Sequence, residues 1–309
     1  MNLVRYLGAI ALGQVLSGAP SGELHLTRLL ELDGVVLDVG MGDVTGDGRS
    51  DVVLLRLDAV ELYQFEDSQA ELSVRYRLSH LPQERIRTRE ARGRLVVEDF
   101  NRDGRAEIFY RVLHRRPGEV LAWTGTDLRA VRNIERVPLC VIRMASRPLV
   151  LFGQAEPGTN YFMPAPELCD INEPHGRSVE ITSPFWDLRC LQPEGAEAPW
   201  MLWVDRQARL HRGESDEPLE PELLSGVGMT PADLDGDGQP EYVLSAPVWP
   251  GQADAVRVHI TPESSWTSRD IVGSIRAMAA EGGRRGAARV LLLSCERAAE
   301  RCRIYLLER

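Results

Sequence analysis

Three short acidic segments of the chain place oxygen-bearing side chains at every second position. They read GDVTGDGRSDVVLL from Gly42, EDFNRDGRAEIFY from Glu98 and ADLDGDGQPEYVLS from Ala232. In each segment an Asp comes second, an Asp-Gly pair marks a turn, and an acid stands four residues after the turn Asp. Alternate donors in a tight turn can converge on one cation, and calcium takes about six to eight oxygen ligands. The spacing therefore predicts three calcium-binding loops.

Each predicted ligand frame contains three side chains, one backbone carbonyl and a closing acid. The frames are Asp43, Thr45, Asp47, the Arg49 carbonyl and Asp51; Asp99, Asn101, Asp103, the Arg105 carbonyl and Glu107; and Asp233, Asp235, Asp237, the Gln239 carbonyl and Glu241. No thiol or imidazole occurs in any frame, which argues against zinc or copper. A glycine follows each turn Asp (Gly48, Gly104 and Gly238) and permits the left-handed backbone of a tight turn.

The EF-hand is the alternative for loops that begin in this way. It requires a bidentate Glu at position twelve and a helix on each side. Position twelve is Leu54, Tyr110 or Leu244 here, and the flanking runs are rich in β-branched and aromatic residues. The sequence therefore favours strands on both sides of each loop. For any single loop, an acidic hairpin turn without a metal is the simpler alternative. The recurrence of the same ligand frame in three loops argues against that alternative.

The strands around these loops belong to a repeated unit. The interval between positions 99 and 233 divides into three steps of about 45 residues, which predicts two degenerate units between them. One further step leads to the hairpin from Ile275 to Leu293, in which the acids are missing. The predicted fold is all-β: a β-propeller of about six four-stranded units, near positions 43, 99, 144, 190, 233 and 280, with five or seven still open.

The two ends of the chain are expected to share one unit. The last unit stops at its third strand, Arg303–Leu307, and the missing fourth strand is available as Glu23–Leu29. A sheet completed from both ends has no exposed edge at that junction.

The three loops resemble those of the FG-GAP/VCBS repeat family, the calcium-loop β-propellers of integrin α-subunit heads and many bacterial secreted proteins. The resemblance covers the three complete loops, and it covers the other three units through hairpin shape and spacing. It implies that the frame residues above hold about three structural Ca²⁺ ions. The loop side chains include ten carboxylates, which repel one another without a cation, and three ions would move the net charge from −10 to about −4.

Composition limits the remaining functions. The net charge of −10 does not favour duplex nucleic acid as a partner. No run of about 18 apolar residues predicts a transmembrane segment. Residues 1–21 resemble a signal peptide or are a lead-in segment, and residues 22–309 form the single predicted propeller domain. Secretion, or a periplasmic or cell-surface location, is therefore expected.

The five cysteines contain no CxxC pair. Cys295 could face Cys302 across a hairpin, and Cys169 could reach Cys190, while five buried small apolar residues are the simpler alternative.

No catalytic motif is evident, and the six histidines are scattered singly. Asp170 and Glu173 lie near His175 in the sequence and could form a catalytic site with it by chance. The six tryptophans include Trp200 and Trp203, which face opposite sides if they share a strand. We therefore expect a non-catalytic binding or adhesion scaffold for a protein partner or a glycan. A carbohydrate-active or phosphoester-cleaving enzyme and an architectural subunit of a surface assembly are the alternatives.

Overall fold

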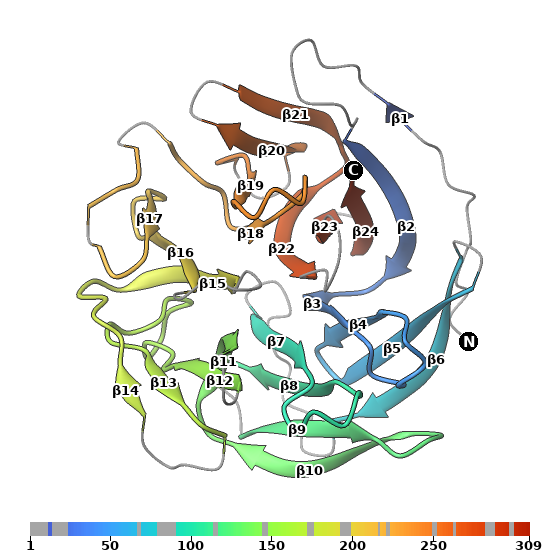
Figure 1. The fold of residues 1–309 in the computed structure, drawn as a ribbon. Helices are drawn as coiled ribbons and strands as arrows, with labels where there is room; N and C mark the ends of the chain where they lie inside the picture. The colour runs from blue at the N-terminus through green and yellow to red at the C-terminus, as the bar shows by residue number, and fades with distance from the viewer. Residues whose placement is uncertain are drawn as a thin grey trace. The chain divides into compact units, whose positions relative to one another are not determined.

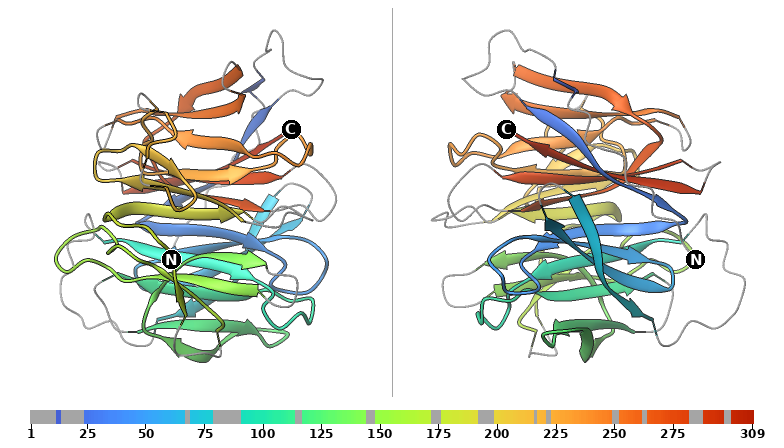
Figure 2. Two further views of the ribbon diagram at one scale, coloured as in Figure 1. Left: turned by 60° about the vertical axis from the view of Figure 1, so that its left-hand side comes forward. Right: turned by 90° about the vertical axis from the view of Figure 1, so that its right-hand side faces the viewer.

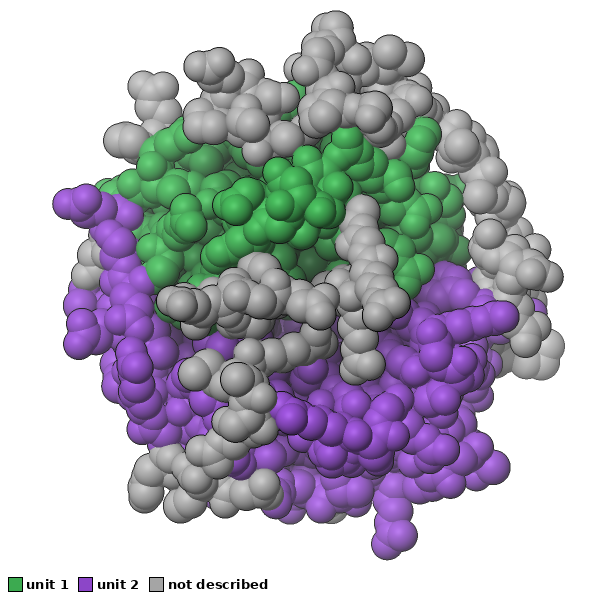
Figure 3. Space-filling view, in the orientation of Figure 1, with its two compact units in different colours: residues 1–35, 189–213, 218–309 green, residues 36–188, 214–217 purple. Residues whose placement is uncertain are grey.

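The structure is a computed structural model. It describes residues 12–13, 24–66, 69–78, 91–113, 117–143, 148–171, 176–191, 199–215, 217–220, 223–248, 252–261, 264–281, 288–296 and 300–309. Every regular element in these ranges is a β-strand, so the predicted all-β class is confirmed. Figure 3 shows two compact units, residues 1–35, 189–213 and 218–309 as unit 1, and residues 36–188 and 214–217 as unit 2.

Unit 2 contains three antiparallel sheets whose strands follow chain order (Figure 1). The first consists of β3 (Val36–Gly42), β4 (Asp51–Arg56), β5 (Ala59–Glu66) and β6 (Gln69–Arg77). The second consists of β7 (Gly93–Glu98), β8 (Glu107–Val112), β9 (Gly118–Trp123) and β10 (Leu128–Ile134). The third consists of β11 (Val137–Arg143), β12 (Pro148–Gly153), β13 (Glu167–Cys169) and β14 (Arg177–Ser178).

The boundary between the two units falls within the first strand of a three-stranded sheet. Its strands are β15 (Phe185–Leu191), β16 (Trp200–Asp205) and β17 (Leu210–Arg212).

Two further sheets belong to unit 1. One consists of β18 (Met229–Ala232), β19 (Glu241–Ser245), β20 (Asp254–Thr261) and β21 (Ser264–Ile271). The other has the order β1-β2-β24-β23-β22, from β1 (Leu12–Gly13), β2 (His25–Asp33), β22 (Ser274–Glu281), β23 (Arg289–Glu296) and β24 (Arg301–Glu308).

The predicted count of six repeated units is confirmed by these six sheets. The two weak middle units were placed correctly: β11 pairs with β12 near position 144, and β15 is the neighbour of β16 near position 190. The hairpin predicted near position 280 pairs as β22 and β23. The second strands read as continuous apolar runs because they are packed on both faces: Val52, Val53, Leu54 and Leu55 are each 0% exposed.

The strand predicted to come from the N-terminal side of the chain pairs with the last strand. Strand β2 is antiparallel to β24, with pairs running from His25 opposite Glu308 to Asp33 opposite Arg301. Figure 2 shows the two strands side by side. Outside Leu12–Gly13, which pairs with β2, the predicted lead-in segment of residues 1–21 lies outside the described residues.

Small residues in the first strands allow neighbouring sheets of one unit to approach closely. A Cβ atom at Gly42 of β3 would lie 2.7 Å from a methyl group of Val97 in β7. A Cβ atom at Gly228, just before β18, would lie 2.7 Å from a methyl group of Ile275 in β22. Each glycine therefore lets the next sheet pack against the end of the strand that leads into an acidic loop.

Among the described residues, no helix is long and apolar enough to cross a membrane.

Candidate metal centres

Loop one connects β3 to β4 and is organised around the carboxylate of Asp43. This group accepts backbone N–H hydrogen bonds from Gly46 (2.7 Å), Asp47 (3.1 Å) and Gly48 (2.9 Å). The carboxylate of Asp47 accepts the N–H of Arg49 at 2.8 Å. The loop backbone therefore wraps around acidic side chains that it partly satisfies.

Loops two and three repeat this plan. The carboxylates of Asp99 and Asp233 accept the N–H groups of Gly104 and Gly238, at 3.0 and 3.1 Å. The turn acids accept the N–H group two residues on, as Asp47 does: Arg105 N–H to Asp103 at 2.9 Å and Gln239 N–H to Asp237 at 2.7 Å. All three loops lie between two strands, which confirms the expectation of strands on both sides. An EF-hand would require helices there.

The closing acid of each frame is buried where the second strand begins. Asp51, Glu107 and Glu241 are 2%, 9% and 3% exposed. Each accepts the N–H of the second loop residue, from Val44 at 2.9 Å, Phe100 at 2.9 Å and Leu234 at 2.5 Å. This contact closes the loop in the same way whether the acid is Asp or Glu.

Burial makes ionisation of these acids costly in the metal-free chain. It raises the pKa of Asp51 to about 6, against the backbone hydrogen bonds from Thr45 and Val44. Burial also raises the pKa of Glu241 to about 7, helped by the charges of Asp235 and Asp233. The pKa of Glu107 is raised for the same reasons. A nearby cation would favour the ionised forms.

Loop three brings three carboxylates to one point. One oxygen each from Asp233, Asp235 and Asp237 lies within 4.8 Å of the others. The Oδ1 atom of Asp233 is buried and, among the described residues, has no hydrogen-bond partner. Converging carboxylate oxygens, on residues that also offer a buried oxygen without a partner, fit a hard divalent cation. The donors in this structure therefore fit Ca²⁺.

The backbone conformation of the loops goes beyond the prediction. The expected positive φ is present at Gly48 (83°), Gly104 (88°) and Gly238 (82°). A second positive φ precedes it in every loop, at Gly46 (79°), Arg102 (61°) and Gly236 (74°). The glycines at two of these three aligned positions could have indicated this second positive φ, but the third position is Arg102, so the pattern was incomplete.

Two of the loops are attached to the following sheet by a backbone hydrogen bond. The carbonyl of Asp43 accepts the N–H of Ala106 at 2.7 Å, directly before β8. The carbonyl of Asp233 accepts the N–H of Ala288 at 2.6 Å, directly before β23. Ordering a loop therefore also orders its attachment to the next sheet of the same unit. The turns of the three degenerate hairpins lie mostly outside the described residues.

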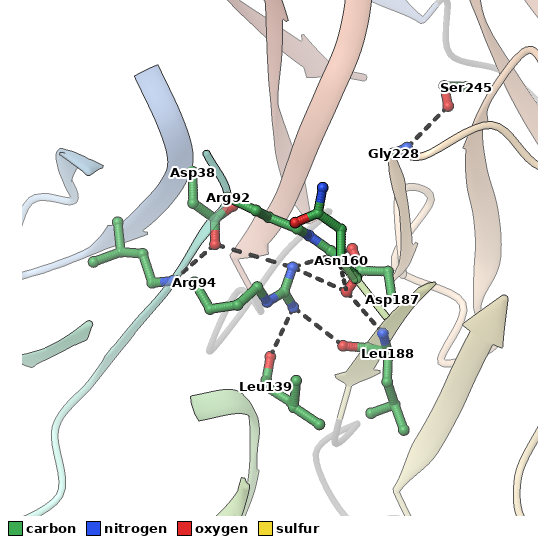
Figure 4. A network of polar contacts seen from close by, with 10 residues as sticks. Asp38, Arg92, Arg94, Leu139, Asn160, Asp187, Leu188, Gly228 and Ser245 are labelled. Atoms are coloured by element: carbon green, nitrogen blue, oxygen red, sulfur yellow. Dashed lines mark hydrogen bonds and ion pairs between the residues drawn. The ribbon is translucent and has the colours of Figure 1, made fainter. Parts of the chain in front are cut away.

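A buried guanidinium in unit 2 forms a second polar centre, which the sequence did not indicate (Figure 4). Arg94 is 2% exposed, and its Nη1 lies 2.9 Å from Oδ1 of Asp187 and 4.0 Å from Oδ2 of Asp38. Its Nη2 donates to the carbonyls of Leu139 (3.2 Å) and Leu188 (3.3 Å). These residues lie on β3, β7, β11 and β15, the first strands of four consecutive sheets.

Histidine and tryptophan serve mainly as packing residues where they are described. His211 is 1% exposed, lies 3.1 Å from Asp205 through Nε2, and stacks on Trp203 at 3.9 Å between ring centroids. Trp203 is fully buried and Trp200 is half-buried, as the odd spacing predicted. Glu173 and His175 lie outside the described residues, so the weak alternative site near His175 is untested.

The cysteine predictions have mixed outcomes. The predicted pair Cys295–Cys302 is a disulfide across the turn between β23 and β24. The predicted pair of Cys169 with Cys190 is wrong, because Cys190 is disulfide-bonded while Cys169 keeps a buried thiol. Spacing along the chain identified the hairpin pair, in which the two residues lie opposite each other, but it could not identify contacts made by the fold.

The sequence matches no family model and no curated protein. The structure is similar to BBS1N in a crystal structure titled as its complex with ARL6DN, soaked with lead: TM-score 0.52, 12% identity, 91% of this chain and 98% of that chain covered. It is also similar to a glucose dehydrogenase: TM-score 0.51, 10% identity, with the same coverage. Hsv2 of Kluyveromyces lactis aligns at a TM-score of 0.39 and 10% identity, over 84% and 72% of the two chains. At these identities the likeness concerns the fold alone, a six-bladed β-propeller.

Proposed function

We propose that the chain is a calcium-stabilised β-propeller of the FG-GAP/VCBS repeat type that acts as a non-catalytic binding scaffold. Two observations on loop three carry the proposal: one carboxylate oxygen each of Asp233, Asp235 and Asp237 converge, and the buried Oδ1 of Asp233 has no hydrogen-bond partner in the part of the chain that the structure describes. The same frame recurs between strands in loops one and two. A bound cation neutralises the loop carboxylates and so stabilises the hairpins.

Each loop holds one ion through the residues of its frame. The side-chain ligands are Asp43, Thr45, Asp47 and Asp51; Asp99, Asn101, Asp103 and Glu107; and Asp233, Asp235, Asp237 and Glu241, with the carbonyls of Arg49, Arg105 and Gln239. The role of the ions is structural. Because two loops are attached to the next sheet, ions at these loops stabilise pairs of sheets within a unit.

Export from the cytoplasm is the second part of the proposal. The disulfide between Cys295 and Cys302 supports it, because disulfides persist mainly in oxidising compartments. The signal-like composition of residues 1–21 points in the same direction. The protein then works where calcium is abundant, as a secreted, periplasmic or surface-attached chain.

The scaffold presents a rigid surface to a protein partner or a glycan. The fold is shared with BBS1N, whose structure is titled as a complex with ARL6DN, and that likeness supports a protein partner. The fold likeness to a glucose dehydrogenase is the one observation behind the enzyme alternative, and a shared fold at 10% identity does not imply a shared reaction.

Removal of calcium tests the structural role. Chelation should lower the melting temperature by several degrees in calorimetry, and Asp47→Ala or Asp237→Ala should each reproduce part of that decrease. Asp58→Ala is the control, because this side chain is 62% exposed in a turn outside the loops. A melting curve that is identical with calcium and with chelator would rule out structural calcium.

Purification from the native organism with calcium, compared with a chelator wash, tests the scaffold role. A stoichiometric protein that is retained in calcium and released by the chelator supports it. Specific signals on a glycan array would indicate a glycan ligand instead. Turnover of a sugar or phosphoester substrate by the calcium-loaded chain would contradict a non-catalytic role.

A further inference from the structure

Loop three differs from the other two loops at one ligand position. The third residue of the loop, counted from its first Asp, is Thr45 in loop one, Asn101 in loop two and Asp235 in loop three. Loop three therefore has four carboxylates where the others have three. Its extra negative charge lies among acids that already repel one another, and it needs compensation in the metal-free chain.

The neutral residues at this position act as hydrogen-bond donors to the loop acids. The Thr45 hydroxyl donates to Asp51 at 3.2 Å, and the Asn101 amide donates to Glu107 at 2.6 Å and to Asp103 at 3.0 Å. An ionised carboxylate has no hydrogen to donate. Asp235 instead accepts the N–H of Asp237 at 3.1 Å. Residues 233–241 include no Lys or Arg, so a positive charge beside Asp235 must come from outside the loop.

Arg309 supplies that positive charge. Its Nη1 lies 3.4 Å from Oδ2 of Asp235, and the two side chains are 17% and 13% exposed. Arg309 directly follows β24, so the contact joins the far end of the chain to the loop between β18 and β19 within unit 1. At this burial the ion pair is less screened by solvent than a fully exposed pair.

We propose that Arg309 is the internal counterion of loop three, and that it stabilises the metal-free loop while lowering the calcium affinity of that loop. The inference rests on the proposed function, because it assumes that Ca²⁺ binds through Asp235. A cation that uses this carboxylate must share it with the guanidinium or displace it, and the two positive charges repel each other. Loops one and two have no equivalent charge on their third residue, so the effect is specific to loop three.

The test is a double-mutant cycle between Arg309→Gln and Asp235→Asn in the full chain. Asp235→Asn gives loop three the same side chain as loop two, which is a natural control for the site. In calorimetric titration, Arg309→Gln should tighten one class of calcium sites about fivefold. In chelator, the same variant should lower the melting temperature. In the Asp235→Asn background, Arg309→Gln should change neither quantity.

Arg75→Gln and Arg301→Gln are the matched controls, because each removes a partly exposed arginine that pairs with an acid outside the three loops. Both variants should leave the affinity of loop three unchanged. If the wild-type chain binds calcium but Arg309→Gln alters neither affinity nor chelated melting temperature, the inference is wrong and the proposed function stands. If the wild-type chain binds no calcium, both are wrong.

Discussion

Arg102 is the one residue of the three loops that adopts a left-handed backbone without being glycine. Its φ is 61°, and the residues at the aligned position of the other two loops, Gly46 and Gly236, have φ values of 79° and 74°. A residue with a Cβ atom is strained in this region by roughly 1 kcal/mol. The geometry is retained because the surrounding hydrogen bonds of loop two require it.

Replacing Arg102 by glycine should therefore stabilise the protein. We expect Arg102→Gly to raise the free energy of unfolding by up to about 0.5 kcal/mol, since the relief of strain slightly exceeds the entropic cost of a more flexible unfolded chain. Urea denaturation in saturating calcium measures the change. Arg105→Gly in the same loop is the control and should not stabilise, because Arg105 has no positive φ. A destabilised Arg102→Gly variant would contradict the strain.

The buried Arg94 stabilises the folded chain, whereas Arg102 is a source of strain. Arg94→Ala should lower the free energy of unfolding by about 3–5 kcal/mol, because it leaves the carboxylates of Asp38 and Asp187 buried beside an empty space. Chemical denaturation measures the loss. Arg289→Ala, which removes a partly exposed partner of Glu281, should cost less than about 1 kcal/mol. Equal losses in the two variants would mean that the buried network contributes no special stability.

At the scale of elements, β20 places two basic residues on one face. Arg257 donates to the carbonyl of Leu224 at 2.6 Å, and the Nε2 atom of His259 is buried without a partner among the described residues. Burial lowers the pKa of His259 below its usual 6.5, the charge of Arg257 acts in the same direction, and Glu220 opposes both. Protonation of His259 is therefore easier in the unfolded chain.

This shift predicts a pH dependence of stability. Below about pH 6.5 the unfolded state takes up more protons at His259 than the folded state, so the free energy of unfolding should fall as the pH decreases. His259→Gln should flatten that decline between pH 7.5 and 5.5, measured by urea denaturation in saturating calcium. An unaltered slope in His259→Gln would show that this histidine is not responsible.

At the scale of the whole molecule, the pairing of β2 with β24 joins segments from opposite ends of the sequence. Leu26, Leu30 and Leu32 of β2 are at most 7% exposed, so the strand adds apolar contacts as well as backbone hydrogen bonds. Without β2, the edge of β24 would be open to pairing with another chain.

Deletion of residues 1–33 should therefore cause aggregation or a loss of cooperative unfolding. A chain that begins at Leu24 keeps the complete β2–β24 pairing and should remain monodisperse. Size-exclusion chromatography with light scattering distinguishes the two variants. A monodisperse, cooperatively unfolding 34–309 chain would mean that the pairing is dispensable.

Local signals in the sequence predicted much of the architecture. The alternating oxygen donors, the Asp-Gly turns and the β-branched runs all act within about 15 residues, so they specify loops and hairpins without knowledge of the fold. The same local character explains the correct pairing of Cys295 with Cys302. The regular interval of about 45 residues then extended the hairpin pattern to units whose acids are missing.

The contacts of Arg94 and Arg309 depended on the tertiary structure. Arg94 meets Asp187 across a separation of 93 residues, and the Arg309–Asp235 pair joins β24 to a loop of another sheet. Neither contact follows a period or a motif, because an arginine can pair with any acid that the folded chain brings within reach. The wrong prediction of a Cys169–Cys190 pair has the same cause, because the partner of Cys190 is set by the fold and not by local spacing. Local spacing predicts where oxygen-bearing side chains cluster, whereas the folded chain sets which distant charges neutralise one another.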